Sequence, residues 1–134
     1  MTLPELESLV RRFEDCTLPR EEWTHRAHLS VAVWYSFHLP REEATERIRT
    51  GIQRYNASLG NTTGYHETIT LSWVTIVASF LREASPEKTL AELATEAAAR
   101  FGASDYLLRY FSKQRLFSET ARREWVDPDL NPLC

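Results

Sequence analysis

Three of the four histidines lie in two short clusters of polar and aromatic residues, and imidazole is a side chain that can bind a metal or move a proton. His25 and His28 are three residues apart, so on a helix both rings project from the same face. His66 falls at the expected first turn of a later helix. Two imidazoles from one helix and a third from its neighbour are a ligand set that helical bundles use for metals. These histidines therefore predict a divalent-metal site, with Zn, Fe, Ni or Mn as candidate ions.

Two glutamates adjoin these histidines and are the candidate catalytic residues. Glu22 precedes His25 by three residues, and Glu67 follows His66 directly. Either carboxylate could be a fourth ligand, orient an imidazole through its second nitrogen, or act as a general base. A metal with an open position would then support hydrolytic or acid/base chemistry on a small molecule. A di-iron carboxylate centre is not expected, because it requires two Glu-x-x-His pairs and the sequence holds one.

Aromatic and cationic side chains near these clusters are the candidate ligand contacts. Trp23 and Tyr65 precede the two histidine clusters. Arg109 and Lys113 are four residues apart, so on one helix they would share a face that could bind a carboxylate or a phosphate. A solvated helix face is the commoner explanation of such a pair.

The same residues also fit a protein without catalytic activity. A buried histidine can hydrogen-bond a backbone carbonyl or cap a helix, and aromatic rings can belong to an ordinary core. The alternative is therefore a non-catalytic helical module that binds a small ligand or another protein and uses its histidines structurally. Four tryptophans would also suit a shared apolar face, so the expected state is a monomer or a homodimer.

The spacing of the apolar residues predicts an all-α fold, a compact bundle of five to seven helices in a single domain over residues 1–134. Helices are expected over about residues 3–14, 20–37, 40–59, 66–83, 86–101 and 118–125, with Thr2, Ser85 and Ser118 as N-caps. Residues 60–64 are the clearest loop, and prolines extend the tail over 126–134. The helices over 20–37 and 66–83 are apolar on more than one side, which predicts that both are central and that the pocket lies between them.

Composition narrows the classes of partner. Hydrophobic residues make up 43% of the 134 residues and charged residues 26%, as in an ordinary globular domain. The formal net charge of −3 gives no basic field for nucleic acid, so no nucleic-acid partner is expected. The sequence has neither a secretion signal nor an apolar stretch long enough to span a bilayer, so we expect a cytoplasmic protein with no membrane association. Cys16 and Cys134 are accordingly expected to be reduced thiols.

Three sequence strings resemble those of a bacterial all-helical protein family. They are W-T-H-x-x-H-L at residues 23–29, G-Y-H-E-T at 64–68 and A-R-x-x-W-V-x-P-D-L at 121–130. The resemblance runs from the first helix to the tail and implies a compact bacterial domain. It brings no known activity and no assigned catalytic residue, because the family has neither.

Overall fold

Helices account for all the regular secondary structure of residues 1–133, which are the residues that the computed structural model describes. The seven α-helices are α1 (Leu3–Glu14), α2 (His25–His38), α3 (Arg41–Ser58), α4 (Glu67–Glu83), α5 (Leu90–Phe101), α6 (Lys113–Leu116) and α7 (Glu119–Arg123). Two 3-10 turns are η1 (Arg20–Glu22) and η2 (Tyr106–Arg109). The predicted all-α bundle of five to seven helices is confirmed. Cys16 is a free thiol, whereas the prediction for Cys134 lies outside the described residues.

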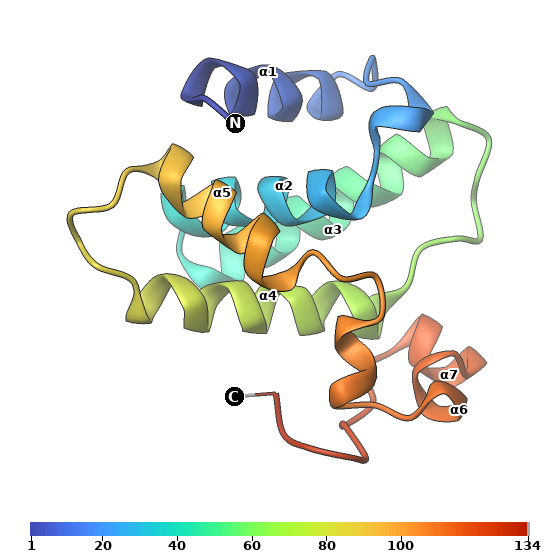
Figure 1. Ribbon diagram of the computed structural model, residues 1–134. Coiled ribbons are helices and arrows are strands. Elements are labelled where there is room, and N and C mark those ends of the chain that lie inside the picture. The colour runs from blue at the N-terminus through green and yellow to red at the C-terminus, as the bar shows by residue number, and fades with distance from the viewer. Residues whose placement is uncertain (134) are drawn as a thin grey trace.

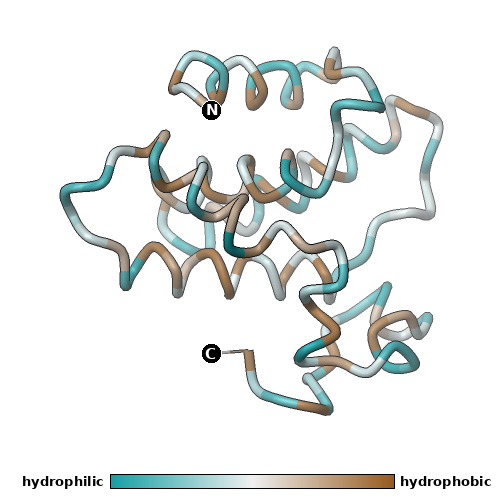
Figure 2. Tube along the Cα trace, in the orientation of Figure 1, coloured by the Kyte–Doolittle hydropathy of each residue, from teal (hydrophilic) through white to brown (hydrophobic). Residues whose placement is uncertain are grey.

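Helix α2 is the central element of the bundle. It contacts α1, α3, α4 and α5, and Figure 1 shows it enclosed between α1 above and α4 below. Leu29 and Val33 on one face of α2 and Val31 on the opposite face are all buried, as the apolar pattern predicts. In Figure 2 hydrophobic residues recur along α2 and α4, whereas the loop between α4 and α5 is mostly hydrophilic. No helix within residues 1–133 has both the length and the apolar character needed to cross a membrane.

The predicted helix over residues 20–37 is split into two elements. Pro19 is followed by η1, and the chain then leaves helical geometry at Trp23 and Thr24. The Thr24 hydroxyl accepts a hydrogen bond from the Ala27 amide at 3.2 Å and so caps α2. A threonine that caps the next helix competes with continuation of the preceding one. Glu22 and His25 therefore do not lie on one helix, which corrects the predicted Glu-x-x-His pair.

The predicted helix starts are confirmed at two places and wrong at one. Thr2 forms a capping box with Glu5, and the Ser118 hydroxyl accepts from the Ala121 amide. Helix α5, however, begins four residues later than expected, at a second capping box between Thr89 and Glu92. Ser85 instead accepts from the Glu87 amide in the preceding turn.

Residues 103–133, here called the C-terminal segment, fold against the first half of α4. Helix α7 contacts α4, and Figure 1 shows α6 and α7 together beside the α4 N-terminus. The tail carries no helix, but it bends at residues 129–131 and is not extended throughout as predicted. The Asp129 carboxylate accepts from the Ser112 amide at 2.8 Å and from the Ser112 hydroxyl at 2.6 Å. The Leu130 amide donates to the Tyr110 carbonyl at 2.9 Å.

Candidate functional site

His28 and Trp23 belong to a packed group of rings, here called the aromatic cluster, which comprises Phe13, Trp23, His28 and Tyr55. The Trp23 ring lies 4.7 Å from the Phe13 ring and 3.8 Å from the His28 ring, centroid to centroid. His28 Nδ1 donates to the Thr24 carbonyl at 2.7 Å. Burial lowers the pKa of His28 to about 4, and this bond opposes the shift without cancelling it. His28 is therefore neutral at pH 7, and Trp23 packs in the core instead of facing a ligand.

His66 is the N-cap of α4, and both of its ring nitrogens are engaged. Nδ1 accepts from the Ile69 amide at 3.1 Å, and Nε2 donates to the Leu116 carbonyl at 2.7 Å. Burial lowers the pKa of His66, which favours the neutral ring that this pair of bonds requires. The imidazole therefore joins the first turn of α4 to the C-terminal segment.

His25 opens α2 and differs from the other two histidines. Its Nε2 donates to the Phe101 carbonyl at 3.0 Å, and its ring centroid lies 5.0 Å from that of Trp73. A carbonyl only accepts, so the Nε2 atom carries the proton and Nδ1 of the neutral ring has a free lone pair. That Nδ1 has no hydrogen-bond partner among residues 1–133.

The three imidazoles thus bind three separate backbone carbonyls and do not meet around a common point. Within the described part of the chain no group of three or more His, Cys, Asp or Glu side chains is placed to hold a metal ion. This geometry does not favour the metal centre expected from His25, His28 and His66. Binding of a metal stays a prediction of the sequence, which elemental analysis of untagged protein tests directly.

Glu67 lies in an ion pair between α3 and α4. Its carboxylate accepts from Arg49 Nε at 3.0 Å, from Arg49 Nη2 at 2.8 Å and from the Tyr65 hydroxyl at 2.6 Å. Burial alone would raise the pKa of Glu67, but the guanidinium and the hydroxyl outweigh it and hold that pKa below its ordinary value. Burial and the bond to Glu67 raise the pKa of Tyr65 to about 12. A carboxylate with three donors is poorly suited to take a proton, so Glu67 and Tyr65 hold two helices together.

The remaining predicted residues are also separated from the histidines. Glu22 pairs with Arg12 across 3.2 Å, between η1 and α1. Arg109 belongs to η2 and lies 4.5 Å from the Tyr106 ring centroid, whereas Lys113 opens α6 after a bend in the chain. The predicted shared helix face of Arg109 and Lys113 is therefore wrong, because no single helix carries both.

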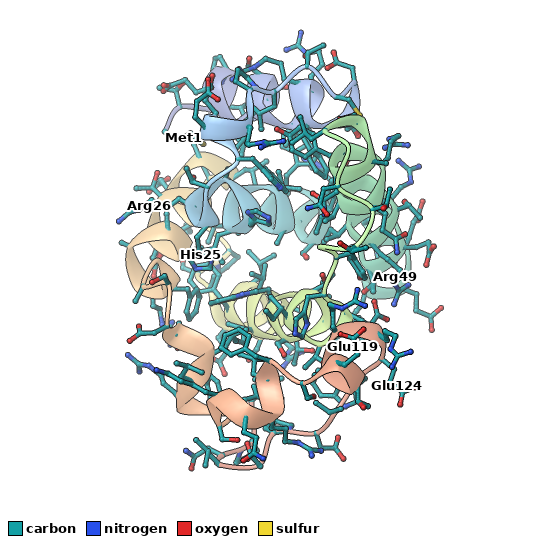
Figure 3. The ribbon with its side chains drawn as sticks, turned by 90° about the vertical axis from the view of Figure 1, so that its right-hand side faces the viewer. Met1, His25, Arg26, Arg49, Glu119 and Glu124 are labelled. Atoms are coloured by element: carbon teal, nitrogen blue, oxygen red, sulfur yellow. The ribbon has the colours of Figure 1, made fainter. Side chains whose placement is uncertain are left out.

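A hollow of about 430 Å³ lies beside His25 and Trp73 and is here called the His25–Trp73 cavity. Helix α2 contributes His25, helix α4 contributes Ile69 and Trp73, and the C-terminal segment closes the remaining sides. That segment supplies Ser104, Asp105, Leu107, Leu108, Leu116 and Phe117. Figure 3 shows His25 next to α5, on the opposite side of the view from Arg49. Of the predicted site residues, His25 alone lines this cavity.

The residues that the C-terminal segment brings to the cavity are not among the predicted site residues. Asp105 and Ser104 sit in a loop and follow no helical period. Phe117 is 63% exposed, and the sequence does not show that this aromatic ring stays outside the core. The polar and charged groups of the cavity are His25, Ser104 and Asp105, and the Asp105 carboxylate forms no hydrogen bond or ion pair with residues 1–133.

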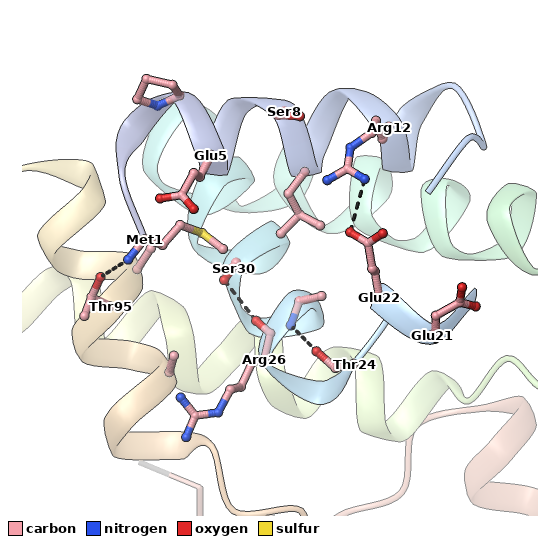
Figure 4. Close-up of a pocket in the computed structure, with 15 residues that line it drawn as sticks. Met1, Glu5, Ser8, Arg12, Glu21, Glu22, Thr24, Arg26, Ser30 and Thr95 are labelled. Carbon is pink, nitrogen blue, oxygen red and sulfur yellow. Dashed lines mark hydrogen bonds and ion pairs between the residues drawn. The ribbon is translucent and has the colours of Figure 1, made fainter. Parts of the chain in front are cut away.

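A larger hollow of about 800 Å³, the α1 cleft, separates α1 from α2 and α5. Figure 4 shows Arg12 of α1 paired with Glu22 of η1 across it. Glu5 is committed to the capping box with Thr2. The cleft is wider and more open than the His25–Trp73 cavity, and two of its three carboxylates already have protein partners. The smaller cavity is the better candidate, because it is more enclosed and because His25 Nδ1 and the Asp105 carboxylate form no hydrogen bond or ion pair within residues 1–133.

Comparison with known proteins adds no relative from which a function could be transferred. No protein-family model, curated protein or solved structure matches this chain.

Proposed function

We propose that this protein is a non-catalytic helical module that binds a small, largely apolar aromatic molecule in the His25–Trp73 cavity. The observation that carries the proposal is the cavity itself. Its volume of about 430 Å³ falls within the range of roughly 300–1,000 Å³ of small-molecule sites. A lining of mainly apolar side chains with a few polar groups is the usual composition of such sites.

The ring of Trp73 suits a flat aromatic ligand. Trp73 is only partly buried and packs against Phe101 and Tyr106, with ring centroids 6.2 Å and 5.6 Å away. Aromatic rings in such contacts gain about 0.5–1.5 kcal/mol beyond the burial of their area. His25 Nδ1 would accept one hydrogen bond from a ligand N–H or O–H group, which would fix the ligand's orientation.

The cavity also explains why the histidines are better seen as structural than catalytic. His28 and His66 hold the aromatic cluster and the C-terminal segment, respectively, and neither lines the cavity. Glu67 is held by Arg49 and Tyr65 on the α3 side of α4. The site that remains offers one hydrogen-bond acceptor on an imidazole and an apolar surface, which suits binding.

Titration with indole, observed by NMR, tests this proposal. Indole is neutral, flat and carries one N–H donor, and we expect saturable shifts of the Trp73 side-chain N–H with a Kd of about 0.1–1 mM. Changing Phe117 to Ala at the cavity rim should weaken binding. Phe37→Ala is the matched control. It removes an exposed phenyl group that lies on α2 and outside the cavity, and it should leave binding unchanged.

A second variant tests whether the ligand occupies the His25–Trp73 cavity. Leu108 lines the cavity and is half-buried, so Leu108→Trp should fill the space and abolish the indole shifts. Circular dichroism and urea unfolding would verify that the variant folds. Absence of saturable shifts at Trp73 in the wild-type protein, or unchanged binding in the folded Leu108→Trp variant, would refute the proposal.

A further inference from the structure

We infer that the His25–Trp73 cavity selects a positively charged ligand, an aromatic amine that carries a protonated amino group, over a neutral or anionic one. This inference rests on the proposed function, since it requires that the cavity binds a ligand. The juxtaposition that carries it is one unpaired carboxylate, from Asp105, at an aromatic cavity whose lining includes neither lysine nor arginine.

The charges around the cavity are asymmetric. Asp105 is the one carboxylate of its lining, and the lining includes neither lysine nor arginine. The nearby Arg109 is stacked on the Tyr106 ring, outside the lining. A ligand ammonium group would therefore meet an uncompensated negative charge, whereas a ligand carboxylate would be repelled by it.

Asp105 is available for such a contact. Its side chain is exposed and makes no hydrogen bond or ion pair with residues 1–133, although its backbone carbonyl accepts from the Leu108 amide at 3.0 Å. That backbone bond fixes the residue at the start of η2, so the carboxylate stays at the edge of the cavity. The Glu67 carboxylate, by contrast, is paired with Arg49.

The rings of the cavity favour the same ligand class. Trp73 and Phe117 present aromatic surface to the cavity, and aromatic faces attract cations as well as flat rings. A ligand ring against Trp73 and an ammonium group at Asp105 would use both features at once. His25 Nδ1 is then left to accept from a ring N–H group.

Three indole compounds with one ring system test this selectivity by calorimetry. Tryptamine is cationic at pH 7, indole is neutral and indole-3-acetate is anionic. In the wild-type protein we expect tryptamine to bind at least about fivefold more tightly than indole-3-acetate, with indole between them, as single exposed ion pairs allow. Equal affinities, or preference for indole-3-acetate, would overturn the inference.

Asp105→Asn removes the charge and keeps the shape of the side chain. It should reduce the ratio of the affinity for tryptamine to the affinity for indole-3-acetate to about one, and it should leave the affinity for indole unchanged. Glu87→Gln, which removes one exposed carboxylate outside the cavity, is the control for net charge and should keep the wild-type ratio. If indole binds but Asp105→Asn leaves the affinity ratio unchanged, the inferred charge selectivity is wrong and the proposed function still stands. If none of the three compounds binds, the proposed function fails instead.

Discussion

Two regions of the molecule, the aromatic cluster and a C-terminal anchor, each contain a histidine that the sequence predicts as a metal ligand. Different interactions hold the histidine in each region. The C-terminal anchor is the group of hydrogen bonds that His66 and Thr68 make with the backbone of the C-terminal segment. In the aromatic cluster, Trp23 stacks on Phe13, and the other ring pairs around the fully buried Phe13 and Tyr55 are tilted. In the anchor, His66 and Thr68 bind the carbonyls of Leu116 and Glu124.

The difference predicts unequal resistance to unfolding. Burying an aromatic ring contributes several kilocalories per mole and depends on the whole surrounding core, whereas a single hydrogen bond contributes about 1 kcal/mol net. A region held by a few such bonds can open locally while the core stays folded. We therefore expect damage to the aromatic cluster to unfold the protein globally and damage to the anchor to release only the C-terminal segment.

The largest effect is expected from truncating the centre of the aromatic cluster. Phe13→Ala should lower the free energy of unfolding by about 3–5 kcal/mol, because it removes a ring that is 0% exposed and leaves a cavity between α1 and α3. Urea unfolding followed by tryptophan fluorescence measures this. Phe37→Ala is the control, since that ring is 47% exposed and should cost far less. Equal losses in the two variants would refute the central role of Phe13.

Phe13→Leu keeps the experiment informative if the alanine variant does not fold. Leucine fills part of the space, so we expect a smaller loss of about 1–2 kcal/mol, still with one cooperative transition. A biphasic transition would show that the aromatic cluster unfolds separately from the rest of the protein. That result would contradict the expected global unfolding.

Lowering the pH should destabilise the folded protein through protonation of His28 in the aromatic cluster. Its pKa of about 4 in the folded protein lies below the ordinary 6.5, so the unfolded chain binds a proton more readily. The stability that the neutral ring contributes is thus complete above pH 6.5 and is lost as the pH falls towards 4. Between pH 7 and 5 we expect a loss of up to about 2 kcal/mol from His28.

His28→Gln separates this contribution from that of other groups. The pKa of His66 is also lowered, so the wild-type protein loses stability from both rings on acidification. Unfolding free energies at pH 7 and pH 5 should differ less in His28→Gln than in the wild type. An identical pH dependence in the two proteins would show that His28 is not held neutral by its surroundings.

The same comparison explains what the sequence could and could not predict. Two members of the aromatic cluster follow from helical periodicity, which places Phe13 on the buried stripe of α1 and Tyr55 on that of α3. The capping box of Thr2 and Glu5 is likewise local, and the structure has it as predicted. The split at Trp23 and Thr24 was missed, because the choice between continuing and capping a helix depends on packing as well as on the residues themselves.

The candidate site could not be predicted in the same way. His25 and Asp105 are 80 positions apart, and a contact between a side chain and a distant carbonyl, such as that of His66 with Leu116, leaves no periodic signal. Spacing placed His25 and His28 on one face, but they occupy the first turn of α2, where each ring reaches a different neighbour. Their roles depend on where α5 and Trp23 lie.

The smallest and most local effect is expected at the anchor. Thr68 is fully buried, donates to the Glu124 carbonyl at 2.9 Å and accepts from the Val126 amide at 3.2 Å. Thr68→Val keeps the shape and removes both bonds, which should cost about 1–2 kcal/mol. Hydrogen exchange should then quicken over the C-terminal segment while amides of α2 stay protected. Thr70→Val is the control, because that hydroxyl donates to the His66 carbonyl and forms no hydrogen bond with the C-terminal segment within residues 1–133.

Thr68→Val also tests whether the anchor supports the candidate site. Leu116 and Phe117 belong to the C-terminal segment and line the His25–Trp73 cavity, so loosening the segment should raise the Kd for indole in proportion to the time the segment spends open. We expect a measurable loss of indole affinity in Thr68→Val and none in Thr70→Val. If exchange quickens but affinity holds, the cavity wall does not depend on the anchor. If exchange quickens equally in α2, the two regions unfold together and the distinction between them is wrong.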